Sequence, residues 1–442
     1  MKVNIITLGC SKNTVDSENL AGALEAAGHT VHFDRQRNDC DITVVNTCGF
    51  IGDAKEESIN TILQQVAVKT RGHKARQLVV CGCLVERYRD ELTAEMPEVD
   101  AWYGAHEWEK MAADIAAAAN ATTSQPAAAD SIAAAPTARS LSTPKHYAYL
   151  KIAEGCNRAC SYCAIPLIRG AHHSRPIDEL VAEAKQLVAG GVKELIVISQ
   201  DTTYYGLDLY HRRALGELLE RLATESGAHW IRLHYTYPTS FPLDAIDAIA
   251  RHDNICNYID IPLQHINSRL LSSMQRGIDH QGTLDLIATF RRRLPNVAIR
   301  TTLIVGYPGE TEAEFEELKN FVATARFDRM GCFAYSPEEG TPAFALGDPV
   351  STDEKQRRID ELMAIQEQIS LERNQALVGQ TLEVMIDRQE GEFYVARSQY
   401  DSPEVDNEVL ISAANTPRLH PGDLRQVRVT DAYENDLIAT LC

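Results

Sequence analysis

One repeating pattern between residues 147 and 335 limits what this chain can fold into. Six short apolar runs typical of β-strands alternate there with segments of helical periodicity. The strand-like runs cover residues 147–152, 194–199, 230–235, 258–262, 298–305 and 329–335. Strands joined by helices pair in parallel, and a closed barrel of this kind needs eight such units. The pattern therefore predicts an α/β fold built around an open, partial (βα)6 barrel.

Different patterns flank this region and predict three further parts. The first hundred residues alternate strand-like runs with helical patterns, which is typical of a small parallel α/β domain. A stretch in which 14 of 27 residues are alanine follows, and Pro126 and Pro136 within it favour a linker, although poly-alanine also favours helix. The chain ends in short alternating strands typical of a small barrel. We therefore expect an N-terminal α/β domain over 1–111, an alanine-rich linker over 112–143, the partial barrel with a following helix over 144–375, and a small antiparallel β-barrel over 376–442.

The cysteine content and the apolar runs indicate a cytoplasmic protein. The 442 residues include 11 cysteines, an odd number and too few for a disulfide-stapled secreted scaffold. The N-terminus lacks the apolar core of a signal peptide, and no stretch is long enough to cross a membrane. In a reducing compartment, clustered cysteines are usually metal ligands or catalytic groups.

The strongest motif is a Cys-x-x-x-Cys-x-x-Cys sequence directly after the first strand of the predicted barrel. It consists of Cys156, Cys160 and Cys163. Three thiolates on one tight loop can hold three irons of a cubane cluster and leave the fourth iron open for a ligand. A structural zinc site with a distant fourth ligand is the alternative.

Three further cysteines occupy equivalent places in the N-terminal domain. Cys10, Cys48 and Cys83 each follow a predicted strand. Parallel strands bring their carboxyl ends to one edge of the sheet, so the three side chains are expected to converge on one ligand. Burial in an apolar core is the alternative for such cysteines, and Cys81 could replace Cys83 as the ligand.

The cysteine loop, with Tyr162 just before its last cysteine, resembles the radical S-adenosylmethionine superfamily. The contexts Leu8-Gly9-Cys10, Asn46-Thr47-Cys48-Gly49 and Gly82-Cys83-Leu84 resemble the N-terminal domain of its methylthiotransferase branch, and the C-terminal segment resembles the TRAM module. This resemblance implies two [4Fe-4S] clusters, one on each set of three cysteines. It also implies S-adenosylmethionine both as methyl donor and as the source of a 5′-deoxyadenosyl radical.

The resemblance also implies residues that contact the cofactor and the substrate. Tyr162 adjoins the cluster, and the turn Gly306-Tyr307-Pro308-Gly309-Glu310 is similar to the family's cofactor-cradling turn, although such a turn alone is an ordinary loop signal. Gln200 and Asp201 are expected at the cofactor, with helix capping as the alternative. Substrate contacts are expected from three residues, with a solvated loop as the alternative for the two arginines: Arg169, Arg175 and His265.

The charge of the C-terminal segment distinguishes two possible substrates. Residues 376–442 contain five arginines, no lysine and twelve acidic residues, a formal charge of −7. Such a surface would repel RNA phosphates but suits a basic ribosomal protein, with a merely solvated acidic surface as the alternative. Residues 396–406 also resemble the branch that acts on a ribosomal protein.

We therefore expect methylthiolation of the β-carbon of an aspartate in small-subunit ribosomal protein twelve. An electron donor such as flavodoxin or ferredoxin is expected as a partner, whereas direct binding of nucleic acid is not. The alternative is methylthiolation of an adenosine next to the anticodon of transfer RNA.

Overall fold

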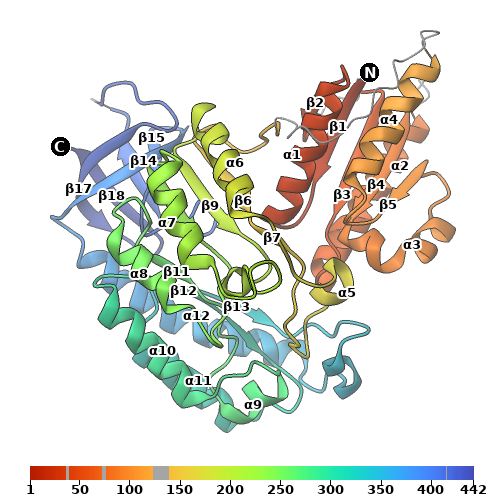
Figure 1. Cartoon of the computed structure of the whole chain (residues 1–442). Coiled ribbons are helices and arrows are strands. Elements are labelled where there is room, and N and C mark those ends of the chain that lie inside the picture. Colours follow the sequence, from red (N-terminus) through yellow and green to blue (C-terminus); the bar gives the residue numbers. More distant parts are fainter. Residues whose placement is uncertain (36–38, 72–75, 123–138, 415) are drawn as a thin grey trace. The chain divides into compact units, whose positions relative to one another are not determined.

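The computed structural model describes residues 1–35, 39–71, 76–122, 139–414 and 416–442 (Figure 1). The chain divides into two compact units, and each is described by itself. The first unit comprises residues 1–142 with 164–171, and the second comprises 143–163 with 172–442. Among the described residues, no helix is long and apolar enough to span a membrane.

The first unit is a parallel sheet covered by helices on both faces. Its sheet has the strand order β2-β1-β3-β4-β5, and every pair is parallel. Leu20 and Met111 pack on one face of the sheet, and Ile62 and Leu84 pack on the other. The predicted parallel α/β domain is thereby confirmed. Its elements are β1 (Lys2–Thr7), α1 (Ser11–Ala26), β2 (Thr30–Phe33), β3 (Ile42–Thr47), α2 (Gly52–Arg71), β4 (Gln77–Gly82), α3 (Cys83–Glu95), β5 (Ala101–Tyr103), α4 (Trp108–Thr122) and α5 (Ile165–Arg169).

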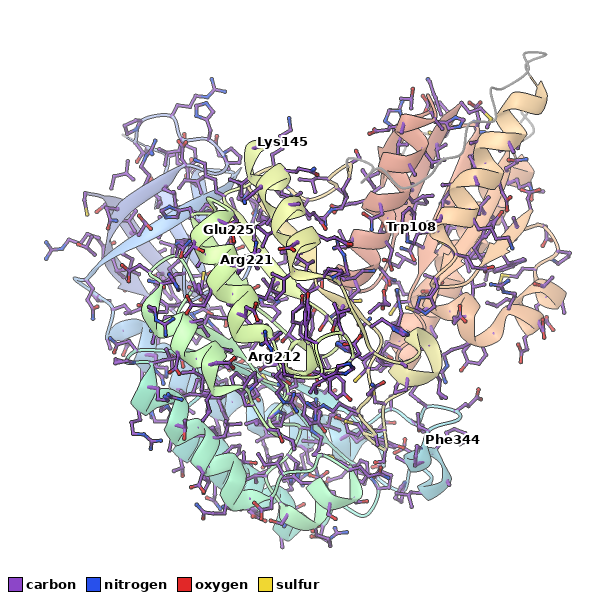
Figure 2. All side chains as sticks on the ribbon, viewed as in Figure 1. Trp108, Lys145, Arg212, Arg221, Glu225 and Phe344 are labelled. Atoms are coloured by element: carbon purple, nitrogen blue, oxygen red, sulfur yellow. The ribbon has the colours of Figure 1, made fainter. Side chains whose placement is uncertain are left out.

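The alanine-rich segment differs from the predicted linker. Its first part is helical, because α4 continues to Thr122, and Ala112 and Ile115 are buried in the core of the first unit. Trp108 begins this helix and packs against the same core (Figure 2). Alanine has the highest helix propensity, and packing against the face of the sheet stabilises the helix that this propensity favours. Residues 123–138 lie outside the described part of the chain.

The second unit contains the six predicted barrel strands. They form two three-stranded parallel sheets, β10-β9-β6 and β11-β12-β13, and an isolated parallel bridge joins Ile231 of β10 to Ile255. A fold with six such strands and helices between them confirms the predicted open barrel. Its elements are β6 (Tyr147–Lys151), β7 (Ala153–Glu154), β8 (His173–Ser174), α6 (Ile177–Ala189), β9 (Glu194–Ile198), η1 (Thr202–Tyr204), α7 (Leu215–Glu225), β10 (Trp230–Leu233), α8 (Leu243–Arg251), β11 (Tyr258–Asp260), α9 (Ser268–Ser273), α10 (His280–Arg293), β12 (Ala298–Val305), α11 (Glu312–Ala325), β13 (Arg329–Ala334) and η2 (Pro342–Leu346).

The amphipathic helices of this unit follow from residue spacing. In α7, the residues at positions 215, 218, 219 and 222 are leucines, and all four are buried. That spacing places them on one face of the helix, which packs inward, while the charged residues between them face solvent. The same pattern explains why α7 and α8 lie side by side on the outside of the barrel (Figure 1).

A closed five-stranded barrel ends the chain, with the strand order β14-β15-β16-β18-β17. The expected small antiparallel barrel is confirmed except in one pairing, because β16 and β18 are parallel. A closed ring with an odd number of strands cannot alternate direction at every pair, so at least one pair must be parallel. Helix α12 (Thr352–Gln375) precedes β14 (Thr381–Glu390), β15 (Phe393–Ser398), β16 (Glu408–Ser412), β17 (Leu424–Ala432) and β18 (Asp436–Leu441).

Buried charges fix this small barrel to the amino-terminal ends of the partial-barrel strands. Glu194 at the start of β9 is fully buried between two arginines, and its Oε1 atom accepts a 2.7 Å hydrogen bond from Arg232 Nε. Its second oxygen pairs with Arg397 of the small barrel. Two further pairs join the same parts: Arg329 Nε with Asp401 Oδ1 at 3.0 Å and Arg300 Nε with Asp406 Oδ1 at 3.3 Å.

Candidate functional site

Three cysteines of the first unit lie where neighbouring strands end and helices begin. Cys10 is the N-cap residue of α1, Cys48 follows β3 and Cys83 is the first residue of α3. The strands β1, β3 and β4 are neighbours, and the register aligns Thr47 with Gly82, each one residue before a cysteine. The sheet therefore brings all three cysteines to its carboxyl edge, as expected from the sequence.

The loops that carry the three cysteines pack closely against one another at Gly9 and Gly49. A Cβ atom added to Gly9 would lie 2.9 Å from Cys48 Sγ, and one added to Gly49 would lie 2.7 Å from the carbonyl oxygen of Cys83. Gly9 also has a φ of +88°, a backbone conformation that favours glycine. Glycine at these two positions thus permits the three loops to converge, and a trio of thiols is the donor set that an iron–sulfur cluster uses.

Burial favours the protonated form of the Cys48 and Cys83 thiols by raising their pKa. Burial raises the pKa of Cys48 to about 12, and the neighbouring Cys10 and Cys83 act in the same direction. Burial also raises the pKa of Cys83, whereas the guanidinium of Arg169 lowers it. Binding of a metal cluster requires thiolates and would therefore release protons.

Cys81 and Cys83 have different surroundings. Cys81 lies within β4 and packs in the apolar cluster with Val3, Ile5 and Leu20. Cys83 starts α3, where the helix dipole favours a thiolate, and its Sγ atom contacts polar side chains. The geometry thus supports Cys83 rather than Cys81 as the ligand.

A matched pair of glycine substitutions tests this arrangement. Gly9 and Gly28 have φ values of +88° and +84°, so alanine costs about 1 kcal/mol of backbone energy at either position. Only at Gly9 does the new methyl group also displace Cys48, since nothing lies within 4 Å of the corresponding position at Gly28. If Cys10, Cys48 and Cys83 hold iron, Gly9→Ala should lose most of it and Gly28→Ala should retain it. Equal iron in the two variants would contradict this geometry.

The second trio of cysteines lies on the loop that follows β6 and β7. The backbone N–H of Arg158 donates to Cys156 Sγ at 3.4 Å, and Arg276 Nη1 donates to Cys160 Sγ at 3.4 Å. The hydroxyl of Tyr237 lies 3.4 Å from the same sulfur of Cys160. Burial raises the pKa of Cys156 to about 11, while the hydrogen bond from Arg158 lowers it.

Hydrogen bonds anchor this loop between its last two cysteines. The N–H of Ser161 donates to the carbonyl of Met274 at 3.0 Å, and its hydroxyl donates to the carbonyl of Ser273 at 2.8 Å. The hydroxyl of Tyr307 lies 3.0 Å from the Ser161 hydroxyl. The ring of Tyr162 packs in an apolar cluster that includes Tyr307 and Tyr335. These contacts fix the spacing of the thiols before any cluster binds.

Gln200 and Asp201 follow β9 at the same carboxyl end of the barrel. Asp201 caps η1 through Thr203, and its other oxygen accepts a 2.6 Å hydrogen bond from Arg158 Nε. Gln200 Nε2 donates to Glu154 at 2.6 Å, whereas its buried Oε1 has no hydrogen-bond partner among the described residues. Asp201 therefore has the capping role that was the alternative in the sequence, and Gln200 retains a polar atom for a ligand.

The glycine-rich turn follows β12. Gly306 and Gly309 have φ values of +73° and +82°, and Glu310 turns inward and is buried. The carboxylate of Glu310 accepts the N–H of Gly306, lies 3.3 Å from His265 Nε2 and pairs with Arg358 at 2.9 Å. Glu310 and His265 thus form one buried polar group, and their roles toward a cofactor or substrate remain predictions.

The two arginines predicted to contact substrate have different surroundings. Arg175 is half-buried and pairs with Glu183 at 2.7 Å. Arg169 is buried, with an exposed fraction of 3%, and contacts Asn13, Asp16 and Cys83. A guanidinium bonded in this way points into the cysteine site of the first unit, so the solvated loop that was the alternative is wrong for Arg169, and its contact with substrate stays a prediction.

Sequence reasoning missed Tyr237 and Arg276 near Cys160, and Arg158 as a partner of Asp201. Arg158 lies within the cysteine motif, so its position was a usable signal. Arg276 and Tyr237 carry no local signal, because only the fold brings them to the loop. The ring of Tyr237 lies between the two guanidiniums, 4.0 Å from Arg158 and 4.2 Å from Arg276.

Three parts of the chain match known protein families. Residues 150–322 match the radical SAM superfamily, residues 2–104 match the uncharacterized protein family UPF0004, and residues 378–442 match the TRAM domain.

The whole chain is similar to curated proteins described as ribosomal protein uS12 methylthiotransferase RimO. The protein of Phocaeicola vulgatus is 50% identical over 440 residues, which covers 99% of each chain. The protein of Parabacteroides distasonis is 52% identical over 437 residues, covering 99% of this chain and 98% of that one. Among solved structures, the radical S-adenosylmethionine methyltransferase TsrM from Kitasatospora setae is similar in fold. It has a TM-score of 0.57 and 15% identity, covering 77% of this chain and 73% of that chain.

Proposed function

The chain belongs to the family of ribosomal protein uS12 methylthiotransferases, and from this premise we propose that it attaches a methylthio group to the β-carbon of an aspartate of uS12. The observation that carries the proposal is identity of about half over the full length of these relatives. Two separate sets of three cysteines, one on three converging loops and one on a single loop, supply the thiols that two clusters would need for this reaction.

The residues of each site have distinct tasks in this proposal. Cys156, Cys160 and Cys163 would hold one [4Fe-4S] cluster, and Cys10, Cys48 and Cys83 would hold the second. When bound, the clusters and S-adenosylmethionine supply the electron, the 5′-deoxyadenosyl radical, the sulfur-bearing metal position and the methyl group.

The protein's own groups hold and orient these partners. The buried Gln200 amide oxygen can accept a hydrogen bond from a cofactor ammonium or hydroxyl group. Gly306 and Gly309 allow the turn after β12 to approach a bound molecule closely. Burial of Cys48, Cys83, Cys156 and Cys160 shields these four side chains from water.

Charge supports a basic protein as the substrate. The closed barrel carries an excess of carboxylates, and exposed members of this set include Glu390, Glu392 and Glu434. Asp401 and Asp406 are paired with arginines inside the protein, so they do not belong to this surface. An acidic surface favours encounter with a basic protein. The proposed reaction on a ribosomal protein takes place in the cytoplasm. A flavodoxin or ferredoxin would supply the electrons.

The variant Cys48→Ala separates formation of 5′-deoxyadenosine from methylthiolation of the substrate. Cys48→Ala removes a ligand of the second cluster but leaves the loop of Cys156 intact. We expect this variant to keep forming 5′-deoxyadenosine at a rate within a few-fold of the unsubstituted enzyme, since that loop belongs to the other unit. Methylthiolation of uS12 should fall below detection. Both products are measured by mass spectrometry after anaerobic reconstitution, and Cys40→Ala is the matched control, because Cys40 belongs to neither trio.

A further inference from the structure

We propose that Arg169, balanced by Asp16, sets the reduction potential of the iron–sulfur cluster held by Cys10, Cys48 and Cys83. The inference rests on the proposed function in assigning a cluster to these cysteines. Arg169 is a positioning residue in this account, because it acts on the cluster through the Cys83 sulfur.

The guanidinium of Arg169 is fully engaged inside the cysteine site. Its Nε–H donates to Cys83 Sγ at 3.3 Å, its Nη1 atom pairs with Asp16 Oδ2 at 2.7 Å, and its Nη2 atom donates to Asn13 Oδ1 at 2.6 Å. Each of the three nitrogens thus has a different partner, and the plane of the group is fixed. Because the planar guanidinium is held at three points, its charged Nε–H group is directed at the Cys83 sulfur.

Asn13 connects this arginine to the two other cysteine loops. Its Nδ2 group donates to the carbonyl of Leu8 at 2.8 Å and to the carbonyl of Thr47 at 3.0 Å. These carbonyls precede Cys10 and Cys48 closely in the chain. Its Oδ1 atom accepts from Arg169, so the amide joins the guanidinium to both loops.

Apolar packing shields the Cys83 side of the site from water. Cys83 has an exposed fraction of 6% and packs with Ala164 and Ile168 of the segment that carries Arg169. In such surroundings a charge acts with a lower effective dielectric constant than at the surface. Reduction potentials of iron–sulfur clusters respond to nearby charge, to hydrogen bonds on the sulfurs and to solvent exposure, and Arg169 affects the first two.

The position of Arg169 in the chain connects the pair of Arg169 and Asp16 with the loop of the other three cysteines. It lies six residues after Cys163, so one short segment carries a ligand of the first cluster and the cation of the second site. A guanidinium on an anionic cluster favours its reduced form and raises its potential, whereas the carboxylate of Asp16 opposes this. The balance between the charges of Arg169 and Asp16 would therefore decide how readily the second cluster is reduced.

The test uses the full chain with Cys156, Cys160 and Cys163 replaced by alanine, so that only the second cluster remains. Anaerobic reconstitution should give about four irons per chain in this background. A redox titration followed by electron paramagnetic resonance then compares Arg169→Met, Arg169→Lys and Asp16→Asn. Arg89→Met is the control, because Arg89 lies in the same unit, is 41% exposed and pairs with Glu107.

We expect Arg169→Met and Asp16→Asn to shift the reduction potential in opposite directions. Arg169→Met leaves the Asp16 carboxylate uncompensated and should move the potential to more negative values, whereas Asp16→Asn should move it to more positive values. Arg169→Lys should stay close to the background protein, as should Arg89→Met. A role limited to packing would not produce opposite signs.

The outcomes separate the inference from the proposed function. A background protein without iron would overturn the assignment of the cluster itself. A loaded cluster whose potential is unchanged by Asp16→Asn, or shifts in the same direction for both charge-removing variants, would overturn the role of Arg169. If Arg169→Met fails to hold iron, Arg169→Lys and Asp16→Asn still decide the question.

Discussion

Replacement of Cys160 by alanine abolishes formation of 5′-deoxyadenosine in our account, and with it all methylthiolation. The loop of Cys156, Cys160 and Cys163 offers three thiols, and two ligands do not hold a cubane with one open iron. Cys160 is also the sulfur contacted by Arg276 and Tyr237, so its loss removes these polar contacts as well. We expect reconstituted iron to fall by about half, since the second trio remains.

The control for this variant is another buried cysteine of the same unit. Cys256 is 1% exposed and packs in an apolar cluster with Trp230 and Tyr258. Cys256→Ala should therefore retain full iron and activity, apart from a modest loss of stability of about 1 kcal/mol for the removed sulfur. Measurable 5′-deoxyadenosine from Cys160→Ala, under conditions in which protein without iron forms none, would contradict the assignment of this loop.

The second large effect concerns the buried charges that join the small barrel to the partial barrel. Glu194→Gln is expected to lower the free energy of unfolding of the second unit by about 3–5 kcal/mol. It leaves Arg232 as an uncompensated buried cation and removes one of the two carboxylates that pair with Arg397, the other being Asp387. Burial raises the pKa of this carboxyl, but the two arginines outweigh burial, and its pKa lies below the usual range. The carboxylate is thus ionised at neutral pH, and the amide cannot replace it.

A partly exposed carboxylate of the same unit provides the matched control. Glu225 at the end of α7 pairs with Arg221 and Lys185 at the protein surface (Figure 2). Exposed pairs contribute little, because solvent and salt screen them, so Glu225→Gln should leave the unfolding midpoint nearly unchanged. Denaturant titrations followed by the fluorescence of Trp230, in a background in which the other tryptophans are phenylalanine, report on this unit. Equal midpoints for the two variants would contradict a structural role for Glu194.

This network also changes the interpretation of the segment at 396–406. Its sequence resembles the branch that acts on a ribosomal protein, which predicts a role in substrate choice. The structure places Arg397, Asp401 and Asp406 in buried pairs with barrel residues. The polar residues of this segment therefore hold the small barrel in place, which leaves recognition of a basic partner to the exposed carboxylates.

The sequence pattern of neighbouring residues predicted the secondary structure and the parallel pairing of strands joined by helices. Strand and helix alternation gave the parallel sheets, and the position of Cys10, Cys48 and Cys83 after strands predicted that they would converge. The contacts of Arg169 and Arg276 could not be predicted, because each depends on segments far apart in the chain meeting at one sulfur. The parallel pairing of β16 and β18 follows from closing an odd number of strands, which a strand list alone does not reveal.

The central claim is tested most directly by the mass of the substrate. Reduced, reconstituted enzyme is incubated with S-adenosylmethionine, purified uS12 and transfer RNA in one mixture, and both macromolecules are analysed by mass spectrometry. The account predicts that uS12 gains one methylthio group on an aspartate, while the transfer RNA nucleosides are unchanged. Unmodified uS12 together with methylthiolated adenosine in the transfer RNA would contradict it.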